Sequence, residues 1–436
     1  MSESGGVVLG VERSLTGKRW EASPADDRVA LALSQRHNLS DIVARILVAR
    51  GVEIDFAEAF LNPSLKSLLP DPSLLKGMDE AVDRLARAVV GEETIGIFGD
   101  YDVDGATSAA LLKRFILAVG GNVDIYVPDR LREGYGPNLP ALLQMKDAGA
   151  GVIVTVDCGI TAFDQLAGAA DAGIDIVVVD HHVAEPQLPA AVAVVNPNRI
   201  DDESGQGQLA AVGVAFLLVV ALNRCLREGG HYAAKAEPNL LQWLDLVALG
   251  TVCDVVPLTG LNRALVAQGL KVMARRGNIG LRALADVASI DEAPTTYHAG
   301  FILGPRVNAG GRVGEASLGT RLLTTHDSDE ARDLAMRLDA WNKERRELEA
   351  ACLEEAIAQA EDRGLRDGLV YVSADNWHAG VIGIVAGRLK DRYNRPACVV
   401  ALDQGVGKGS GRSVTGVDLG AAVVAARQSD LLINGG

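Results

Sequence analysis

Long apolar runs are scarce in this sequence. The longest, residues 209–222, is too short to span a bilayer and contains Gly213. The first residues carry no basic stretch followed by an apolar core, so they do not form a secretory signal. These absences argue against a membrane protein and predict a cytoplasmic location.

Cysteine and aromatic residues are also few. The five cysteines show neither CxxC spacing nor an evident pairing, which fits a reducing compartment and argues against a disulfide-stapled secreted domain. Aromatic residues make up only 4% of the chain, so aromatic stacking on a ligand cannot be extensive. The cysteines are Cys158, Cys225, Cys253, Cys352 and Cys398.

Positive charge is in deficit, with 42 Lys and Arg against 57 Asp and Glu and a net charge of −15. This balance argues against a protein that coats nucleic acid electrostatically. It does not exclude a nucleic-acid enzyme with a local basic groove. Several of the acids also belong to a candidate metal site, whose ions would offset their charge.

The chain does contain a dense acidic run. Asp100, Asp102 and Asp104 stand at alternate positions directly after the apolar stretch 95–98. Three carboxylates so close repel one another, and a hard divalent cation such as Mg²⁺ or Mn²⁺ neutralises them. A helix-loop-helix calcium loop is excluded, because its twelfth position needs a glutamate and here holds Leu111.

Alternating strands and helices predict an α/β fold. Short β-branched runs are separated by stretches of helical character, which is the pattern of crossover units in a parallel sheet. Two of the runs are continuously apolar, as strands buried on both faces are. We expect strands at 95–98, 123–127, 152–156, 175–179 and 191–195, with helices at 106–119, 139–148 and 162–172.

A chain of 436 residues has room for two or three domains. A long charged helix is expected over 327–362, a stretch without Gly or Pro, and a further α/β unit begins near residue 369. The predicted parts are a helical N-terminal preface (1–85), a parallel-sheet catalytic domain (86–325), a long connecting helix (326–366) and an incomplete second α/β domain (367–436).

Acids and histidines follow three of the predicted strands at the point where each strand ends. The acidic run follows the first strand, Asp157 follows the third, and Asp180, His181 and His182 follow the fourth. Ligands of open parallel sheets bind at the carboxyl ends of the strands, so we expect these side chains to meet there. Metal-activated water attacking phosphorus is the chemistry that such a cluster supports. Imidazole among the ligands favours Mn²⁺ over Mg²⁺.

Several motifs resemble those of the DHH phosphoesterase superfamily, which takes its name from the tripeptide at 180–182. Within that superfamily the chain is most similar to the bacterial exonucleases that are specific for single strands and work 5′→3′. The likeness runs from about residue 35 to the end. Its motifs, in the same order as in the family, lie at 99–107, 156–160, 180–182, 196–198, 245–257, 304–309, 377–384 and 409–412.

The resemblance implies two bound metal ions, Mn²⁺ or Mg²⁺. Asp254 enters the ligand set through the family alone, because by itself it reads as an aspartate at a helix end. His182 is expected as a catalytic residue that is either a ligand or its close neighbour. The ligands implied are Asp100, Asp102, Asp104, Asp157, His181 and Asp254.

The second domain resembles the substrate-binding module called DHHA1. Its glycine-rich segment 405–412 would set backbone amides against phosphate, with a flexible surface loop as the alternative. An arginine fork suits a terminal phosphate, which would explain selection for a 5′ end. Tyr135 is a candidate for stacking on a base, and His378 for a substrate contact or for core packing. The substrate-binding residues implied are Arg130, Tyr135, Arg306, Asn308, Arg312, His378, Ser410, Gly411 and Arg412.

The chain departs from the family in two places. Residues 308–312 read Asn-Ala-Gly-Gly-Arg where the family has Asn-Ala-Ala-Gly-Arg. The sequence also stops at residue 436, where the family continues with the rest of DHHA1 and an oligonucleotide-binding domain. We therefore expect metal binding to survive, while DNA affinity and processivity depend on the part that is missing.

The resemblance implies a metal-dependent exonuclease that degrades single-stranded DNA from its 5′ end in recombination and repair. A helicase and a single-strand-binding protein are candidate partners. Two alternatives stay open: an oligonucleotide or cyclic-dinucleotide phosphodiesterase of the same superfamily, and a related scaffold without catalysis. The scaffold is disfavoured because every ligand position is filled.

Overall fold

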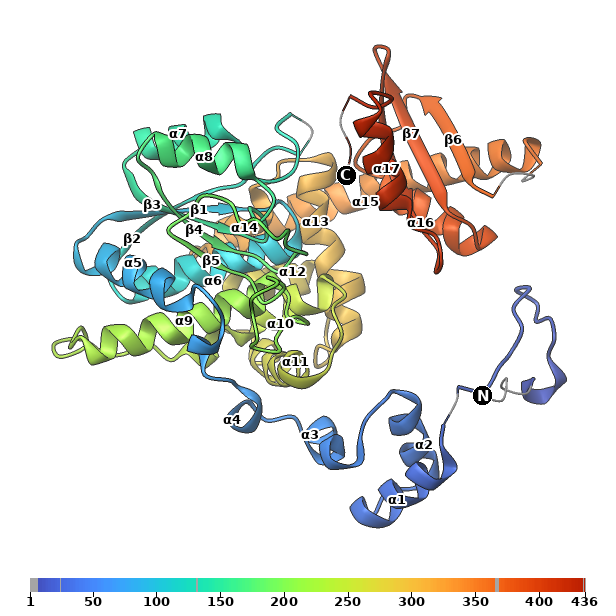
Figure 1. Cartoon of the computed structure of the whole chain (residues 1–436), viewed down its shortest axis with the longest axis horizontal. Coiled ribbons are helices and arrows are strands. Elements are labelled where there is room, and N and C mark those ends of the chain that lie inside the picture. The colour runs from blue at the N-terminus through green and yellow to red at the C-terminus, as the bar shows by residue number, and fades with distance from the viewer. Residues whose placement is uncertain (1–6, 24, 131, 365–367, 434, 436) are drawn as a thin grey trace.

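The computed structural model describes residues 7–23, 25–130, 132–364, 368–433 and 435. It contains an α/β body, a long helix, a second α/β domain and a small helical unit near the N-terminus (Figure 1). The predicted boundary between residues 366 and 367 lies outside the described residues. Among the helices described, none is long and apolar enough to cross a membrane.

The central sheet has five strands, all parallel, in the order β2-β1-β3-β4-β5. Three strands, β1, β3 and β4, bury nearly every residue, which explains their continuous apolar sequences. The predicted parallel sheet is confirmed. Its strands are β1 (Thr94–Gly99), β2 (Asn122–Tyr126), β3 (Ala150–Val156), β4 (Asp175–Val179) and β5 (Ala193–Val195).

Helices cover both faces of this sheet (Figure 1). One face packs on α7 (Leu139–Asp147) and α8 (Phe163–Asp171). The other face packs on α5 (Met78–Val90), α6 (Val103–Ala118) and α9 (Ala211–Glu228). Helix α5 thus lies in the main core, so the division placed at residue 85 falls inside a helix of the α/β body.

A helical layer continues the main core beyond α9. Helix α10 is buried along almost its whole length between α6 and α11, which fits its uniformly apolar sequence. Its C-terminal end therefore reaches the edge of the sheet where the strands finish. The layer consists of α10 (Leu244–Cys253), α11 (Gly260–Met273), α12 (Ile279–Val287), the π-helix η5 (His298–Leu303), α13 (Gly304–Val313) and α14 (Leu318–Thr324).

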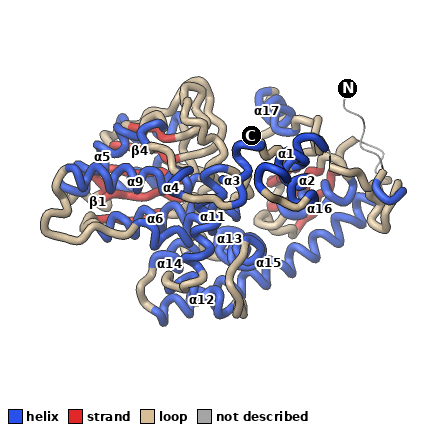
Figure 2. The backbone as a smooth tube through the Cα atoms, turned by 90° about the horizontal axis from the view of Figure 1, so that it is seen from below, coloured by secondary structure: helices blue, strands red, loops and turns tan. Residues whose placement is uncertain are grey.

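Helix α15 (Ser328–Asp362) joins the two α/β domains, and Figure 2 shows it running from one group of strands to the other. Asp327 caps its first turn by accepting hydrogen bonds from the amides of residues 329 and 330. The predicted helix begins one residue away from the observed one.

The second domain has a three-stranded sheet in the order β6-β7-β8. Strand β8 pairs antiparallel with β7, so residues 406–412 form an edge strand and not the flexible loop considered as the alternative. Glycine leaves this strand with little to bury, and most of it is exposed. The elements are β6 (Val370–Asp375), α16 (Ile382–Tyr393), β7 (Ala397–Asp403), β8 (Val406–Arg412) and α17 (Leu419–Gln428).

The N-terminal helices form a small core of their own around Leu33 and Leu47. Their exposed position beside the main body is visible in Figure 1. They are α1 (Asp27–His37), α2 (Asp41–Ala49), α3 (Ala57–Leu61) and α4 (Leu65–Leu68). Short 3₁₀ turns are η1 (Val8–Gly10), η2 (Ile54–Phe56), η3 (Pro72–Leu74) and η4 (Leu240–Trp243).

Candidate metal centre

Carboxylates from distant parts of the chain meet around one imidazole. The Nε2 atom of His181 lies 3.3 Å from Asp157 Oδ1, 3.6 Å from Asp254 Oδ2 and 3.9 Å from Asp104 Oδ2. These four residues follow β4, β3, α10 and β1. The predicted meeting of acids and histidines at the carboxyl edge of the sheet is therefore present.

The acidic run folds into the first turn of α6. Asp102 caps this helix, and its Oδ1 accepts a hydrogen bond from the amide of Gly105 at 3.0 Å. A Cβ atom at Gly105 would lie only 2.5 Å from the carbonyl oxygen of Asp100, so glycine is required for this close approach. The tight turn brings Asp100 and Asp104 to the same edge.

Asp104 is held by the start of another helix. Its Oδ2 accepts a hydrogen bond from the amide of Ala211 at 2.6 Å, and its Oδ1 accepts one from Val212 at 2.9 Å. These amides belong to the first turn of α9, where the helix dipole favours a negative charge. The side chain is buried and has one orientation available.

Asp157 adopts a left-handed backbone conformation, with φ of 61°, directly after β3. Such a conformation is unfavourable for a residue other than glycine and marks functional sites. The hydroxyl of Tyr135 donates to the carbonyl oxygen of Asp157 at 3.2 Å and lies 3.5 Å from His182 Nδ1. Tyr135 is thus tied to the cluster by its hydroxyl, while its ring remains 55% exposed.

Asp180 orients the two histidines. Its buried carboxylate accepts hydrogen bonds from the amides of Ile160, His181 and His182, and lies 2.7 Å from His182 Nδ1. Burial alone would raise the pKa of Asp180, but these hydrogen bonds lower it on balance. The carboxylate therefore stays ionised and fixes the orientation of His182.

The two imidazoles have opposite electrostatic surroundings. The hydrogen bond to Asp180 raises the pKa of His182. Burial, with the neighbouring His182 ring, lowers the pKa of His181, and the backbone of Leu209 bonds its imidazole. His181 is thus a neutral ring with its Nε2 aimed at the acids, as in a metal ligand.

The surroundings of the clustered aspartates disfavour the ionised form of their carboxyl groups. Burial and then the charge of Asp102 raise the pKa of Asp100 to about 8 and that of Asp254 to about 7. Burial, followed by the neighbouring carboxylates, raises the pKa values of Asp104 and Asp157 well above their usual range. A cation placed among them would reverse these shifts.

The donor atoms that point into the cluster have no partner within the described part of the chain. Asp100 Oδ1, Asp157 Oδ1, His181 Nε2 and Asp254 Oδ2 are buried without a hydrogen bond. Leaving such atoms unsatisfied is costly, and oxygen with imidazole nitrogen is a donor set suited to Mn²⁺ or Mg²⁺. Three triads have donor atoms within 4.8 Å of one another: Asp100, Asp102 and Asp157; Asp104, His181 and Asp254; Asp157, His181 and His182.

A wide cavity of about 750 Å³ separates the α/β body from the second domain. Arg130 and Gly134 line it from the β2–α7 connection, and Gly383 and Ser410 line it from the second domain. The guanidinium of Arg130 lies over the ring of Tyr101 at 5.1 Å, beside the acidic run. The cavity thus reaches strand β8 on one side, and Arg130 connects its other side to the acidic run through Tyr101.

Basic side chains gather around Arg312, among them Arg130, which lines this cavity. Burial, followed by the positive charges of Arg130, Arg345 and Arg412 among its neighbours, lowers the pKa of Arg312 to about 10. Arg412 lies 3.3 Å from the hydroxyl of Ser410 and donates to the carbonyl of Gly411 at 2.7 Å. Like charges gathered in a half-buried site form a place for an anion.

His378 lies next to this basic cluster. Its Nδ1 accepts a hydrogen bond from the amide of Gly380 at 3.1 Å, and the carbonyl of Gly380 accepts one from Arg312 at 3.2 Å. A Cβ atom at Gly380 would overlap the backbone of Arg312. The 377–380 segment thus connects the second domain to α13.

Arg306, for which the resemblance implied a phosphate contact, makes two bonds within the protein. Its Nε donates to Asp339 Oδ1 at 2.9 Å, and its Nη1 donates to the carbonyl of Ile302 at 2.8 Å. Asp339 lies on α15, so this ion pair braces α13 against the long helix. Asn308, two residues further along α13, is half-buried.

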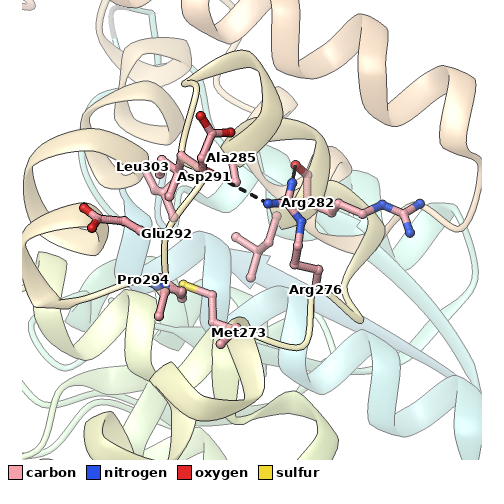
Figure 3. Close-up of a pocket in the computed structure, with 12 residues that line it drawn as sticks. Met273, Arg276, Arg282, Ala285, Asp291, Glu292, Pro294 and Leu303 are labelled. Carbon is pink, nitrogen blue, oxygen red and sulfur yellow. Dashed lines mark hydrogen bonds between the residues drawn. The ribbon is translucent and has the colours of Figure 1, made fainter.

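A smaller cavity of about 270 Å³ lies away from the acids, between the end of α11, α12 and the loop before η5 (Figure 3). Its floor is formed by apolar side chains such as Met273 and Leu303. Arg276 closes one wall through an ion pair with Asp286 and a hydrogen bond to the carbonyl of Ile290. None of the clustered acids or histidines lines this cavity.

Some supporting residues escaped the sequence reasoning. Asn196 and Asn198 donate to the carbonyls of His182 and His181, and so fix the backbone of the histidine pair. The Asn-Pro-Asn motif was visible as part of the resemblance but suggested no role. The groups of Ala211 and Val212 that hold Asp104 are backbone amides, which every residue except proline has. The residue types in the sequence therefore could not point to them.

Comparisons with known proteins agree with this architecture. The model of the DHH family, N-terminal domain, matches residues 94–251, and that of the DHHA1 domain matches residues 366–436. The single-stranded-DNA-specific exonuclease RecJ of Dickeya dadantii is 44% identical over 392 residues, covering 88% of this chain and 67% of that protein. The RecJ of Bacillus subtilis is 38% identical over 405 residues, covering 92% of this chain and 50% of its own length.

A solved structure of exonuclease RecJ bound to manganese superposes with a TM-score of 0.71 at 36% identity. The match covers 83% of this chain and 88% of that one. The chain spans between half and about two thirds of the length of the curated relatives described above.

Proposed function

Because the chain belongs to the DHH family and, within it, to the RecJ single-stranded-DNA-specific exonucleases, we propose that it hydrolyses single-stranded DNA from the 5′ end. The observation that carries this proposal is the set of four buried donor atoms, on Asp100, Asp157, His181 and Asp254, that have no hydrogen-bond partner among the described residues. A cleft lined by arginines opens beside them.

The donor set fits two divalent cations. Asp100, Asp102 and Asp157 would hold one ion, and Asp104, His181 and Asp254 the other. Manganese-bound RecJ of closely similar fold supports this assignment. When bound, such ions lower the pKa of water and stabilise the entering and leaving oxygens of a phosphodiester.

His182 stands on the solvent side of this cluster, with its Nδ1 held by Asp180. That arrangement leaves Nε2 available, and the hydrogen bond to Asp180 raises the pKa of the ring, which favours its protonated form. We assign Nε2 the role of donating a hydrogen bond to the phosphate under attack. Tyr135 limits rotation of the ring from the other side.

The arginines gathered around Arg312 supply the 5′ selectivity. Arg130, Arg312 and Arg412 would bind the terminal phosphate, with Ser410 and the backbone of Gly411 beside them. A terminal phosphate carries more charge than an internal one and exposes more oxygens for bidentate contacts. This binding would place the first phosphodiester over the acids and release mononucleotides.

Metal-dependent digestion of a long, 5′-phosphorylated strand tests the proposal, with a dinucleotide as the second substrate. We expect Mn²⁺-dependent release of mononucleotides from the strand, and no cleavage by Asp157→Ala at an unchanged fold. Asp164→Ala, an exposed acid on α8, is the matched control. Cleavage of the dinucleotide alone would favour the alternative of a short-oligonucleotide phosphodiesterase.

We also propose that the protein works in the cytoplasm, on strands that a helicase unwinds and a single-strand-binding protein covers. All five cysteines are free thiols, which supports a reducing compartment. Stimulation of digestion by a helicase acting on duplex DNA would test the partnership, and equal rates with and without the helicase would contradict it.

A further inference from the structure

Two aromatic rings lie exposed beside the metal end of the cleft. Tyr297 is 58% exposed and Phe301 is 74% exposed. Their ring centroids are 5.3 Å apart and their planes differ by 27°, so the two rings stack on one another. A joined pair of large apolar side chains in contact with water marks a surface that binds something.

The pair is close to Asp254. The carbonyl of Ala299 on η5 lies 3.5 Å from the sulfur of Cys253, the residue before Asp254. A Cβ atom at Gly300 would lie 3.3 Å from the side chain of Val252. Helix η5 therefore packs against the end of α10 through Ala299 and Gly300. Phe301 is the next residue of the chain. Val255, the residue after Asp254, is 86% exposed.

Helices η5 and α13 together form one rod, which also borders the acidic run and the arginines. Helix α13 continues η5 without a break, and a Cβ atom at Gly311 would lie 2.8 Å from the carbonyl of Tyr101 in the acidic run. Arg312 follows, among the other arginines. The arginines thus stand at one end of the rod and the aromatic pair at the other, with the acids between them.

We propose that Tyr297 and Phe301 form a stacking platform for bases of a single strand on the 3′ side of the bond that is cut. The inference rests on the proposed function, which places the 5′ phosphate among the arginines. A strand that starts there and crosses the acids leaves on the side of Asp254, where the aromatic pair lies. Stacking on aromatic rings needs no particular base, as a sequence-tolerant exonuclease requires.

The test compares a 5′-phosphorylated twelve-residue oligothymidylate with the dinucleotide pTpT, both cut by the full chain in Mn²⁺. We expect the double variant Tyr297→Ala and Phe301→Ala to raise KM for the twelve-mer about tenfold or more. Its preference for the twelve-mer over pTpT, taken as a ratio of kcat/KM values, should fall by the same factor. Phe301→Trp, made alone in the parent protein, should keep the preference, because it keeps a ring at this position.

Leu241→Ala is the matched control, since Leu241 is an apolar side chain of similar exposure (52%) far along the chain from η5. It should keep the preference of the parent protein. Equal preference in the double variant and the parent would overturn the platform. Equilibrium binding of the twelve-mer in the presence of a chelator separates the two claims. Weaker binding by the double variant supports the platform even if neither substrate is cut, and failure to cut pTpT counts against the proposed function only.

Discussion

The metal end of the central sheet and the glycine-rich strand β8 face the same cleft, but they are built in different ways. Asp100, Asp104 and Asp157 are buried, and Asp104 is fixed by an element far away in the sequence, the first turn of α9. Strand β8 pairs on one side only, is largely exposed, and its Arg412 contacts its own neighbours. The fold therefore fixes the positions of the clustered carboxylates before any ligand binds. The arginine side chains near β8 would become ordered only when a phosphate binds.

Loss of one metal-site acid should have the largest effect. We predict that Asp254→Asn lowers kcat by about a thousandfold, because one ion loses an anionic ligand and several kcal/mol of charge stabilisation. Steady-state rates in Mn²⁺ measure the change. Asp164→Asn should leave the rate unchanged, and a variant of Asp254 with normal activity would remove this residue from the site.

Loss of an arginine of β8 should have a smaller and different effect. We predict that Arg412→Ala raises KM about tenfold to a hundredfold for a 5′-phosphorylated strand, since a hydrogen bond to a charged group contributes about 1.5–3 kcal/mol. A strand with a 5′ hydroxyl should respond much less. Arg427→Ala, at an exposed position on α17, is the control. Equal losses for both strands would contradict a contact with the terminal phosphate.

Metal ions should stabilise the fold in a way that depends on pH. The pKa values of about 8 for Asp100 and about 7 for Asp254 exceed those of the unfolded chain, so the metal-free fold holds extra protons and loses stability as pH rises from about 4 to 8. Mn²⁺ should therefore raise Tm more at pH 8 than at pH 5. Thermal melts at both pH values measure this, and an equal rise at both would contradict it.

The smallest effect on catalysis is expected at Arg306, which the sequence placed with the phosphate ligands. Its ion pair with Asp339 is largely buried, so Arg306→Met should lower the free energy of unfolding by about 1–3 kcal/mol. KM should change by less than about threefold, because Asp339 and the carbonyl of Ile302 already hold the guanidinium. A large rise in KM without loss of stability would return Arg306 to the phosphate site.

The sequence was sufficient for the sheet and for most of the acids at its edge. Alternation of strands and helices predicts parallel strands, and parallel strands present their carboxyl ends together. Asp100, Asp157 and His181 could be placed together on that ground alone. This reasoning works because each residue's position depends on its own strand and on a general rule of sheet geometry.

Other parts of the site depend on packing between distant segments, which local patterns do not encode. Asp254 reaches the cluster because α10 is buried between α6 and α11, and only the family resemblance pointed to it. The pairing of Arg306 with Asp339 depends on how α13 lies against α15. The glycines of 405–412 predicted backbone amides set against phosphate, with a flexible loop as the alternative, and gave no sign of the seven backbone pairings with β7 that make the segment a strand.

The central claim is that two groups of side chains hold two cations side by side, with Asp100, Asp102 and Asp157 around one and Asp104, His181 and Asp254 around the other. Anomalous diffraction from crystals of this chain grown with Mn²⁺ tests it most directly. The expected result is a pair of manganese peaks, one contacting Asp100, Asp102 or Asp157 and the other contacting Asp104, His181 or Asp254. Manganese bound elsewhere, with these side chains left uncoordinated, would contradict the account.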